Sequence, residues 1–400
     1  MATIDYSTPP SEISSRIAKL QRHLQQAGID GALILQNTDL YYFSGTIQQS
    51  HLYIPAQGEP LLMVRKSLER ARTESPIAAI VPLKSPKQLM GLIDENGLTP
   101  PATIGMELDV MPANTYFMYK KRLVGVKIKD ISLSIRMIRA VKSDYELSLI
   151  RKAAAFSDQV AESMPGLLEE GITEIELAGK VEARARQLGH QGIVRMRMWG
   201  AEMFYGHLMA GSSAAVPSYL ASPTGGAAVN AAVAQGPSFK KIKRNEPVLL
   251  DYVFAWKGYI SDHTRIFCIG EPPGQLVDAH AHMLDLQAHI KTRATPGANA
   301  GELYSEAVEM AARQGVDKHF MGAQGPDRIR FIGHGVGLEL DEFPFLAQGQ
   351  QMALAEGMVI ALEPKLIYPG KGVVGIENTH VVTAKGLEQL THAEEKIVSI

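Results

Sequence analysis

The sequence predicts an α+β protein built from two domains, with the boundary near residue 138. The first third alternates short helical and strand-like segments, whereas the remainder combines long helices with antiparallel strand pairs. A chain of 400 residues is also longer than one compact core usually serves. The composition, with 46% apolar and 20% charged residues, is that of an ordinary globular protein.

The first domain, residues 1–138, is expected to be an α/β layer structure. Apolar residues at helical spacing predict a helix over 11–27, which ends at Gly28. The elements expected after it are a strand at 31–36, two strands around a turn within 51–64, a strand at 77–83, a helix near 86–95, a strand at 103–110 and a helix near 113–123. No cluster of His, Asp or Glu at ligand spacing occurs in this part of the sequence, so the site is expected in the second domain.

The second domain, residues 139–400, is expected to mix helices with antiparallel ribbons. Two Ser/Thr-x-x-Glu capping boxes, Ser143 with Glu146 and Thr173 with Glu176, each predict the start of a helix. Further helices are predicted near 276–292 and 301–314, and strands at 247–253, 259–269, 358–364 and 375–382. The segment 218–236, rich in Ala, Gly and Ser, is predicted to be a loop.

Charge and composition exclude several classes of function. A formal charge of −2 without a long run of like charges argues against nucleic acid or an anionic membrane as a partner. No apolar stretch approaches the roughly 20 residues that span a bilayer. The single cysteine, Cys268, rules out an internal disulfide and fits a reducing compartment. The polar N-terminus shows no export signal, so the chain is predicted to be cytoplasmic.

Five acidic or imidazole side chains of the second domain form the candidate site. Asp251 and Asp262 flank a lysine–glycine turn, so a two-stranded ribbon would bring both carboxylates to one place. His334, Glu363 and Glu377 follow in apolar or glycine-rich stretches, where a charged group is costly unless it is paired or bound to metal. Four carboxylates and one imidazole suit two hard divalent cations that share a bridging water.

Each of these residues taken singly also fits a structural role. Asp251 could cap a turn, Asp262 could pair with Arg265, and Glu377 could belong to a cross-strand ion pair. Taken together, the five groups have too few nearby basic residues to be neutralised by ion pairs, because Arg265 and Lys365 are the only obvious local partners. The combination therefore favours a metal site.

The motifs also resemble a known family. The order Asp-x10-Asp, GHGVGL, Glu-Pro and Gly-Ile-Glu-Asn-Thr is similar to that of the pita-bread metallopeptidases, which include prolidase and Xaa-Pro aminopeptidase. The segment IRMIRAVKSDYELSLIRKAA resembles that family's link into its catalytic domain. The resemblance implies a pita-bread (creatinase/aminopeptidase) catalytic domain over 139–400, preceded by a creatinase/prolidase-type α/β domain over 1–138.

The resemblance also implies a role for each ligand. Asp251 would bind one metal in bidentate fashion, Asp262 and Glu377 would bridge two metals, and His334 and Glu363 would complete the second. The ions would be two per chain, manganese, cobalt, iron or zinc, and a carboxylate-rich set favours manganese. A metal-bridging hydroxide would be the nucleophile, with Glu363 as general base.

The chain departs from the family at two histidine positions. Seven residues after the metal histidine, where the family usually carries another His, this chain has Asp341. The histidine usually found upstream of the first metal aspartate aligns with Ser218 or Ala234. A carboxylate at 341 would oppose a developing oxyanion, so Asp341 predicts either slow cleavage of proline peptides or a substrate that carries a cationic group. His207 is the first candidate for a replacement catalytic role.

Three functions follow from these observations. The first is a dimetal hydrolase that cleaves a peptide-type C–N bond, an Xaa-Pro aminopeptidase or dipeptidase, with Tyr205 and Arg265 in contact with a small peptide substrate. The second is an enzyme of the same fold that performs C–N hydrolysis or lyase chemistry on a non-peptide substrate. The third is a catalytically silent binding protein, against which the intact ligand set argues. We expect the first, and the resemblance further implies a homodimer.

Overall fold

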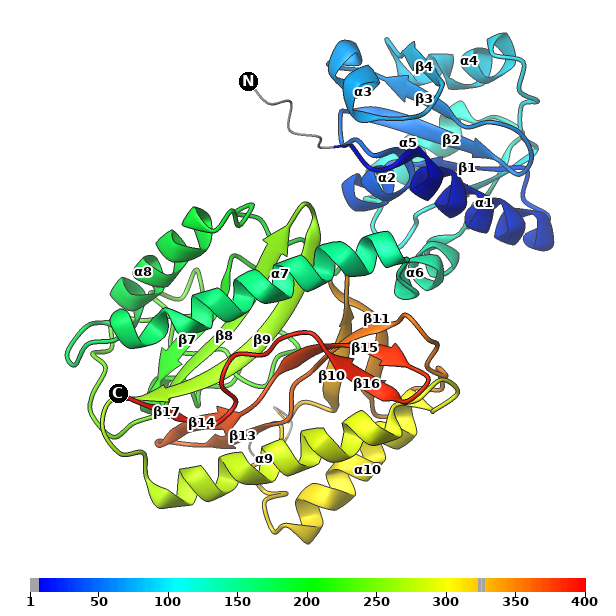
Figure 1. Cartoon of the computed structure of the whole chain (residues 1–400). Coiled ribbons are helices and arrows are strands. Elements are labelled where there is room, and N and C mark those ends of the chain that lie inside the picture. Colours follow the sequence, from blue (N-terminus) through cyan, green and yellow to red (C-terminus); the bar gives the residue numbers. More distant parts are fainter. Residues whose placement is uncertain (1–6, 323–324, 326–327) are drawn as a thin grey trace. The chain divides into compact units, whose positions relative to one another are not determined.

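The computed structural model describes residues 7–322, 325 and 328–400. It divides into two compact units, Met1–Arg139 and Ala140–Ile400, which appear in Figure 1. Residues 1–6, which belong to the segment expected to lack an export signal, lie outside the described residues. None of the described helices combines the length and the apolar character needed to cross a membrane.

The first unit contains a mixed six-stranded sheet in the order β4-β3-β2-β1-β5-β6. The pairs β1–β2 and β2–β3 are antiparallel and the other three pairs are parallel, as expected for an α/β layer structure. The strands are β1 (Gly31–Ile34), β2 (Ser50–Pro55), β3 (Leu61–Val64), β4 (Ala79–Pro82), β5 (Thr103–Met106) and β6 (Lys127–Asp130). The helices are α1 (Pro10–Ala27), α2 (Asn37–Ser44), α3 (Leu68–Glu74), η1 (Pro86–Gln88), α4 (Leu89–Glu95), α5 (Ala113–Arg122) and α6 (Ser132–Ala140), the last of which reaches the unit boundary.

The described part of the second unit contains three sheets. Their orders are β17-β9-β8-β7, β11-β10-β12-β15-β16 and β13-β14. The strands are β7 (Gly206–Ala210), β8 (Val248–Trp256), β9 (Tyr259–Cys268), β10 (Phe331–Val336), β11 (Leu340–Ala347), β12 (Val359–Leu362), β13 (Lys365–Tyr368), β14 (Gly372–Gly375), β15 (Asn378–Thr383), β16 (Gly386–Gln389) and β17 (Val398–Ser399). The helices are α7 (Asp144–Glu162), η2 (Met164–Gly166), α8 (Glu174–Gln187), η3 (Gly211–Ser213), α9 (Gly274–Arg293) and α10 (Ala300–Arg313).

Both predicted capping boxes are present in the second unit. The Ser143 and Thr173 side chains each accept a hydrogen bond from the backbone N–H three residues later. In the same two caps, the Glu146 and Glu176 side chains each accept a hydrogen bond from the backbone N–H of the cap residue. These caps satisfy the free N–H groups at the starts of α7 and α8. The caps explain why the sequence located both helix starts to the residue.

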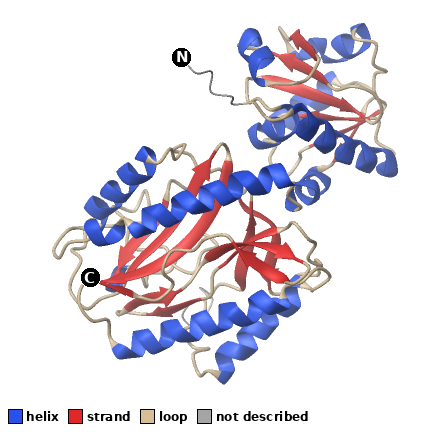
Figure 2. Cartoon of the chain, in the orientation of Figure 1, coloured by secondary structure: helices blue, strands red, loops and turns tan. Residues whose placement is uncertain are grey.

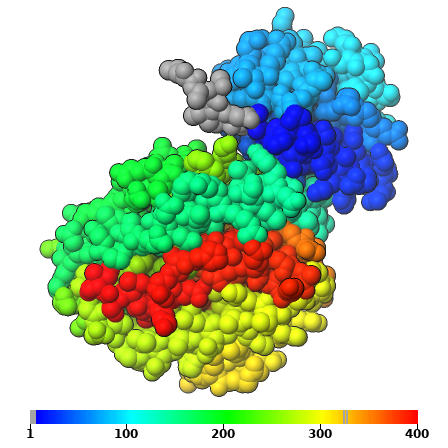
Figure 3. Space-filling view, in the orientation of Figure 1, coloured from blue at the N-terminus to red at the C-terminus, as the bar shows by residue number. Residues whose placement is uncertain are grey.

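The second unit consists of two halves, each with its own apolar core. Helices α7 and α8 pack on β7, β8 and β9, and helices α9 and α10 pack on the sheets that hold β10 to β16. Figure 2 shows these helices outside the strands. The last residues of the chain lie between the halves (red in Figure 3): the His392 and Ala393 N–H groups donate to Asp158 on α7, and the Glu395 carbonyl bonds to His280 on α9. Asp251 and Asp262 belong to the first half, and Glu363 and Glu377 to the second.

Candidate metal centre

Asp251 and Asp262 lie on the antiparallel ribbon β8–β9 that the sequence predicts. Asp251 faces Thr264 across the ribbon, and Asp262 faces Val253. This register makes the two carboxylates diagonal neighbours on the same face of the sheet. The ribbon thus brings both side chains to one place, although they are eleven residues apart in the sequence.

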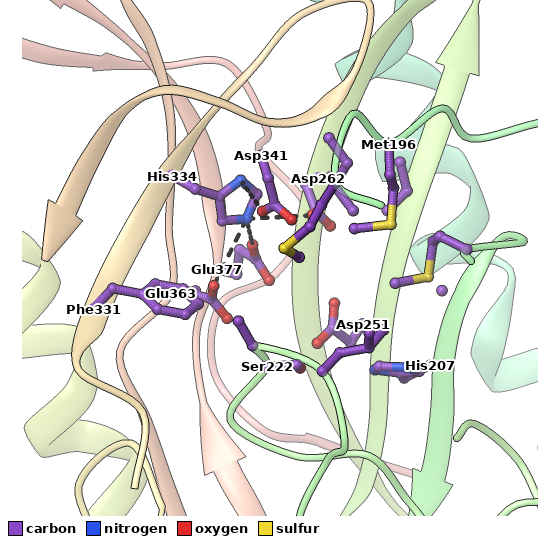
Figure 4. Close-up of a pocket in the computed structure, with 17 residues that line it drawn as sticks. Met196, His207, Ser222, Asp251, Asp262, Phe331, His334, Asp341, Glu363 and Glu377 are labelled. Atoms are coloured by element: carbon purple, nitrogen blue, oxygen red, sulfur yellow. Dashed lines mark ion pairs between the residues drawn. The ribbon is translucent and has the colours of Figure 1, made fainter. Parts of the chain in front are cut away.

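The other three candidate ligands come from separate segments of the chain. His334 lies on β10, Glu363 follows β12, and Glu377 lies just before β15. Glu377 forms an isolated β-bridge with Thr264, whose hydroxyl also donates to Glu377 Oε2 at 2.8 Å. Figure 4 shows the five side chains pointing into a common pocket.

The closest part of the cluster surrounds the imidazole of His334. Its Nε2 atom lies 3.9 Å from Asp262 Oδ2, 3.7 Å from Glu363 Oε1 and 3.8 Å from Glu377 Oε1. One ligand atom from each of Asp262, His334 and Glu377 lies within 4.8 Å of the other two. All of these side chains are buried. These spacings match the donor atoms of a single small cation.

The electrostatics of this cluster fit a divalent metal. Burial, followed by the nearby carboxylates of Glu377 and Asp251, raises the pKa of Asp262 well above its usual range. Burial also raises the pKa of Glu377 to about 7. Asp262 Oδ1 is buried and has no hydrogen-bond partner in the part of the chain that the structure describes. A cation would relieve the repulsion between carboxylates and occupy the unused acceptor.

His334 is oriented for metal binding through its other ring nitrogen. Its Nδ1 atom lies 3.2 Å from the carbonyl oxygen of Gly335. A carbonyl can only accept, so Nδ1 carries the proton and Nε2 is left with a free lone pair. Asp341 Oδ1 lies 3.5 Å from the same Nδ1. Burial by itself would lower the pKa of His334, but the carboxylates of Asp341, Glu363 and Glu377 outweigh it and raise that pKa.

A lysine ammonium occupies the other side of the cluster. Lys365 Nζ lies 2.7 Å from Glu363 Oε2, 2.9 Å from Asp251 Oδ2 and 3.0 Å from Glu377 Oε2. The sequence identifies Lys365 only as a local base and does not predict its place among the ligands. One available signal was strand alternation, which puts residues 363 and 365 on the same side of an extended chain.

The remaining predicted site residues have different positions. His207 lines the pocket, faces Asp251 across β7–β8 and lies 3.4 Å from Gln235 Oε1. Burial, the largest effect, lowers the pKa of His207. Among the described residues, the pocket lining does not include Tyr205, whose ring stacks on Tyr252.

Arg265 lies behind the cluster and is buried, which differs from the substrate contact expected from the sequence. Its guanidinium is buried and donates to the carbonyls of Ala393, Thr264 and Glu377 and to the side chain of Asn378. It lies outside the pocket lining in the described part of the chain. Adjacent strand residues point to opposite faces, and Arg265 follows Thr264, which points to the cluster. Arg265 therefore fixes the backbone of Glu377 from behind.

Methionines that the sequence did not single out form one wall of the pocket. Met196, Met198 and Met203 line it, together with Leu220 and neighbouring residues of the predicted loop 218–236. Flexible thioether side chains fit irregular apolar groups well. This segment has no ligand spacing or charge pattern, so nothing in its sequence indicates that it lines the pocket.

The geometry agrees with the comparison to known families. The model of metallopeptidase family M24 matches residues 148–384, a segment that contains all five candidate ligands and more than half of the chain. The chain belongs to metallopeptidase family M24. A second model, the creatinase/prolidase N-terminal domain, matches residues 16–141 of this M24 chain. The predictions of a pita-bread metallopeptidase and of its α+β fold are confirmed.

Known relatives and solved structures resemble the M24 chain over nearly its whole length. The Xaa-Pro dipeptidase of Pyrococcus furiosus is 28% identical over 390 residues, which cover 96% of this chain and 100% of the relative. The prolidase structure from Pyrococcus horikoshii OT3 is 27% identical, covers 95% of this chain and 99% of its own, and gives a TM-score of 0.79. The Xaa-Pro dipeptidase structure from Bacillus anthracis, at 23% identity, shows the same fold with a TM-score of 0.82, over 97% of this chain and 100% of its own.

Proposed function

We propose that this protein is a metal-dependent peptidase that cleaves Xaa-Pro dipeptides. The observation that carries the proposal is the convergence of Asp262, His334 and Glu377, from three separate segments, on one buried position with the spacing of metal donors. Membership of family M24 and the names of the relatives support a peptidase specific for proline in the second position. An aminopeptidase that removes the residue before proline would cleave the same type of bond in a longer peptide.

The proposed metal position uses oxygen and imidazole donors of the chain. Asp262, His334 and Glu377 would hold the ion, and manganese is the metal that a carboxylate-rich set favours. When bound, a divalent ion supplies a Lewis acid for the scissile carbonyl and lowers the pKa of a bound water. The second ion expected from the sequence would need the carboxylates that Lys365 contacts.

The surrounding residues would orient the substrate and move protons. Glu363 directs Oε1 toward His334 and Oε2 toward Lys365, so Oε1 is the atom that we assign as proton acceptor. The methionine wall would receive an apolar first residue of the dipeptide. His207, a buried imidazole in the lining, remains the candidate for contact with the leaving amine.

A dipeptide panel tests the proposal. Leu-Pro and Met-Pro should be hydrolysed in the presence of Mn²⁺, whereas Leu-Ala should be a poor substrate. Chelation should abolish the activity and added Mn²⁺ should restore it, and Asp262→Asn should be inactive at any Mn²⁺ concentration tested. A protein with measured bound metal that cleaves no Xaa-Pro dipeptide would exclude this substrate class.

A second candidate, a non-peptide substrate on the same metal site, is favoured by Asp341. Its carboxylate lines the pocket and its side chain is 24% exposed, so it can receive a cationic group of a substrate. A metal-loaded protein that fails the dipeptide panel but hydrolyses amides bearing a cationic group near the scissile bond would support this candidate.

We also propose a cytoplasmic homodimer. The resemblance to the prolidase family supports the dimer, and a single buried cysteine supports a reducing compartment. Light scattering on the purified protein should give twice the mass of the 43.5 kDa chain.

A further inference from the structure

The ammonium of Lys365 contacts three of the four carboxylates of the cluster. An ammonium has three N–H donors, and Lys365 Nζ has a carboxylate oxygen within 3.0 Å for each of them. The three oxygens belong to Asp251, Glu363 and Glu377, which are three of the five candidate ligands of a two-metal site. Lys365 therefore uses donors that a pair of ions would require.

Two of these carboxylates divide their oxygens between two cation positions. Glu363 and Glu377 each direct Oε2 to Lys365 Nζ and Oε1 to His334 Nε2. The carboxylates thus bridge the ammonium and the position enclosed by His334, Glu377 and Asp262. The cluster has two cation positions, and the chain itself fills one of them.

The fold holds Lys365 in this position. Its side chain is 1% exposed, and its Cα lies directly opposite Gly375 in the β13–β14 pair. A Cβ atom added at Gly375 would lie 2.7 Å from Lys365 Cα and 3.0 Å from Lys365 Cγ. The absence of a side chain at 375 therefore provides the space through which the lysine stem reaches the cluster.

An ammonium and a metal ion cannot share these oxygens. Divalent ions bind carboxylate oxygens at about 2.0–2.2 Å. An ion at that distance from Asp251, Glu363 and Glu377 would lie almost on Lys365 Nζ, against strong repulsion in a buried site. One ammonium with one divalent ion also leaves less unbalanced charge among four carboxylates than an empty site would.

We propose that Lys365 replaces one of the two metal ions, so that the chain binds a single divalent ion at Asp262, His334 and Glu377. This inference rests on the proposed function, because it takes the remaining position to be a metal site. It also assigns Asp251 to the ammonium rather than to a metal. Lys365 is then a fixed cation beside the metal, a positioning residue for Glu363 and Glu377.

Metal counting on the full chain tests the proposal. The protein is stripped with chelator, saturated with Mn²⁺, freed of unbound ions by gel filtration and analysed by mass spectrometry for metal per chain. Wild type should retain one Mn²⁺. Lys365→Met keeps an unbranched stem but removes the charge, so it should retain two, and Lys365→Arg should retain one. Lys142→Met is the matched control, because Lys142 is also buried but pairs with Glu342, and it should retain one.

Paramagnetic resonance of bound Mn²⁺ gives an independent readout that needs no activity. Wild type should show the spectrum of an isolated ion, and Lys365→Met that of an exchange-coupled pair. If circular dichroism shows that Lys365→Met does not fold, the metal count and the spectrum of wild type decide whether the chain binds one ion or two.

The outcomes separate this inference from the proposed function. Two ions in wild type overturn the inference and leave a metallopeptidase. One ion in both wild type and folded Lys365→Met also overturns it, because Lys365 would then not be what excludes the second ion. No bound ion in any variant refutes the proposed function, and the inference with it.

Discussion

At the scale of single residues, His334 depends on the groups that face its Nδ1 atom. The Gly335 carbonyl fixes the tautomer, and the Asp341 carboxylate at 3.5 Å raises the basicity of the ring. Asp341 also adopts a left-handed backbone conformation, with φ of 63°. Asparagine tolerates this conformation, so it removes the charge without disturbing the turn.

We expect Asp341→Asn to bind Mn²⁺ about 10–100-fold more weakly, which is the usual effect of losing an outer partner of a metal histidine. Calorimetric titration of the chelator-treated protein measures the change. Asp317→Asn, a change outside the pocket lining of the described residues, is the control and should bind as wild type does. Unchanged affinity in Asp341→Asn would show that the Gly335 carbonyl alone orients the ring.

A second residue-scale prediction concerns His51 in the first unit. Burial, followed by the charge of Arg65, lowers the pKa of His51 to about 4. The folded state therefore keeps the ring neutral, while the unfolded chain takes up a proton below its ordinary value near 6.5. Stability is lost as pH falls from 6.5 toward 4.

Between about pH 7 and about pH 5, the free energy of unfolding of wild type should fall by about 2 kcal/mol more than that of His51→Gln, because glutamine does not titrate. Hydrogen exchange of peptides from β2, corrected for its intrinsic pH dependence, measures this difference locally. The exposed His23, changed to Gln, should behave as wild type. Equal losses in wild type and His51→Gln would contradict the prediction.

Sequence reasoning singled out the candidate ligands for one physical reason and missed the position of Lys365 for another. Charged groups in apolar strands stand out, because burying them without a partner is costly. A lysine beside those acids looks like an ordinary ion-pair partner. Its position among three carboxylates depends on the β13–β14 register, which brings Gly375 opposite Lys365 and was not part of the prediction. The orientation of Arg265 was available from the sequence, because strand alternation from Asp262 puts residue 265 on the opposite face of β9.

At the scale of elements, the β8–β9 ribbon was predictable and the β10–β11 pair was not. The ribbon has a turn signal between two strongly apolar strands, whereas β10 contains the glycine-rich FIGHGVG sequence, which has weak strand propensity. Pairing with β12 explains the glycine: a Cβ at Gly333 would lie 2.7 Å from the Ala361 carbonyl oxygen. The β10 strand therefore depends on close packing against β12, which is visible only in the folded structure.

The β13–β14 pair gives an element-scale prediction. Gly375→Ala should destabilise the protein by about 1–3 kcal/mol more than Gly370→Ala, since the new methyl group would lie 2.5 Å from the Pro364 carbonyl oxygen as well as against Lys365. Gly370, in the turn of the same pair, has a positive φ of 77° but no atom within 4 Å of an added Cβ. It therefore reports the cost of an ordinary left-handed conformation alone, and the φ of 153° at Gly375 adds to the expected difference. Denaturant midpoints measure the stability of both variants. Equal midpoints would contradict the prediction, because they would show that β13 and β14 can move apart to fit the new methyl group without loss of stability.

At the scale of the whole molecule, all five candidate ligands lie in the unit Ala140–Ile400. Metal should therefore stabilise this unit selectively. With Mn²⁺ near one hundred times its Kd, the free energy of opening for peptides of β8 and β9 should rise by about 2.7 kcal/mol. Peptides of β2 in Met1–Arg139 should show no change in hydrogen exchange. Equal protection in both regions would mean that the two units unfold together.

The pairing of Lys365 with Gly375 has a consequence for descent. A lysine stem cannot enter the cluster while a side chain occupies position 375, because the added Cβ would meet both the stem and the backbone of residue 365. A long side chain at 365 that points into the cluster is therefore compatible only with glycine at 375. Relatives with a bulky residue at the position of Gly375 should lack a long side chain at the position of Lys365.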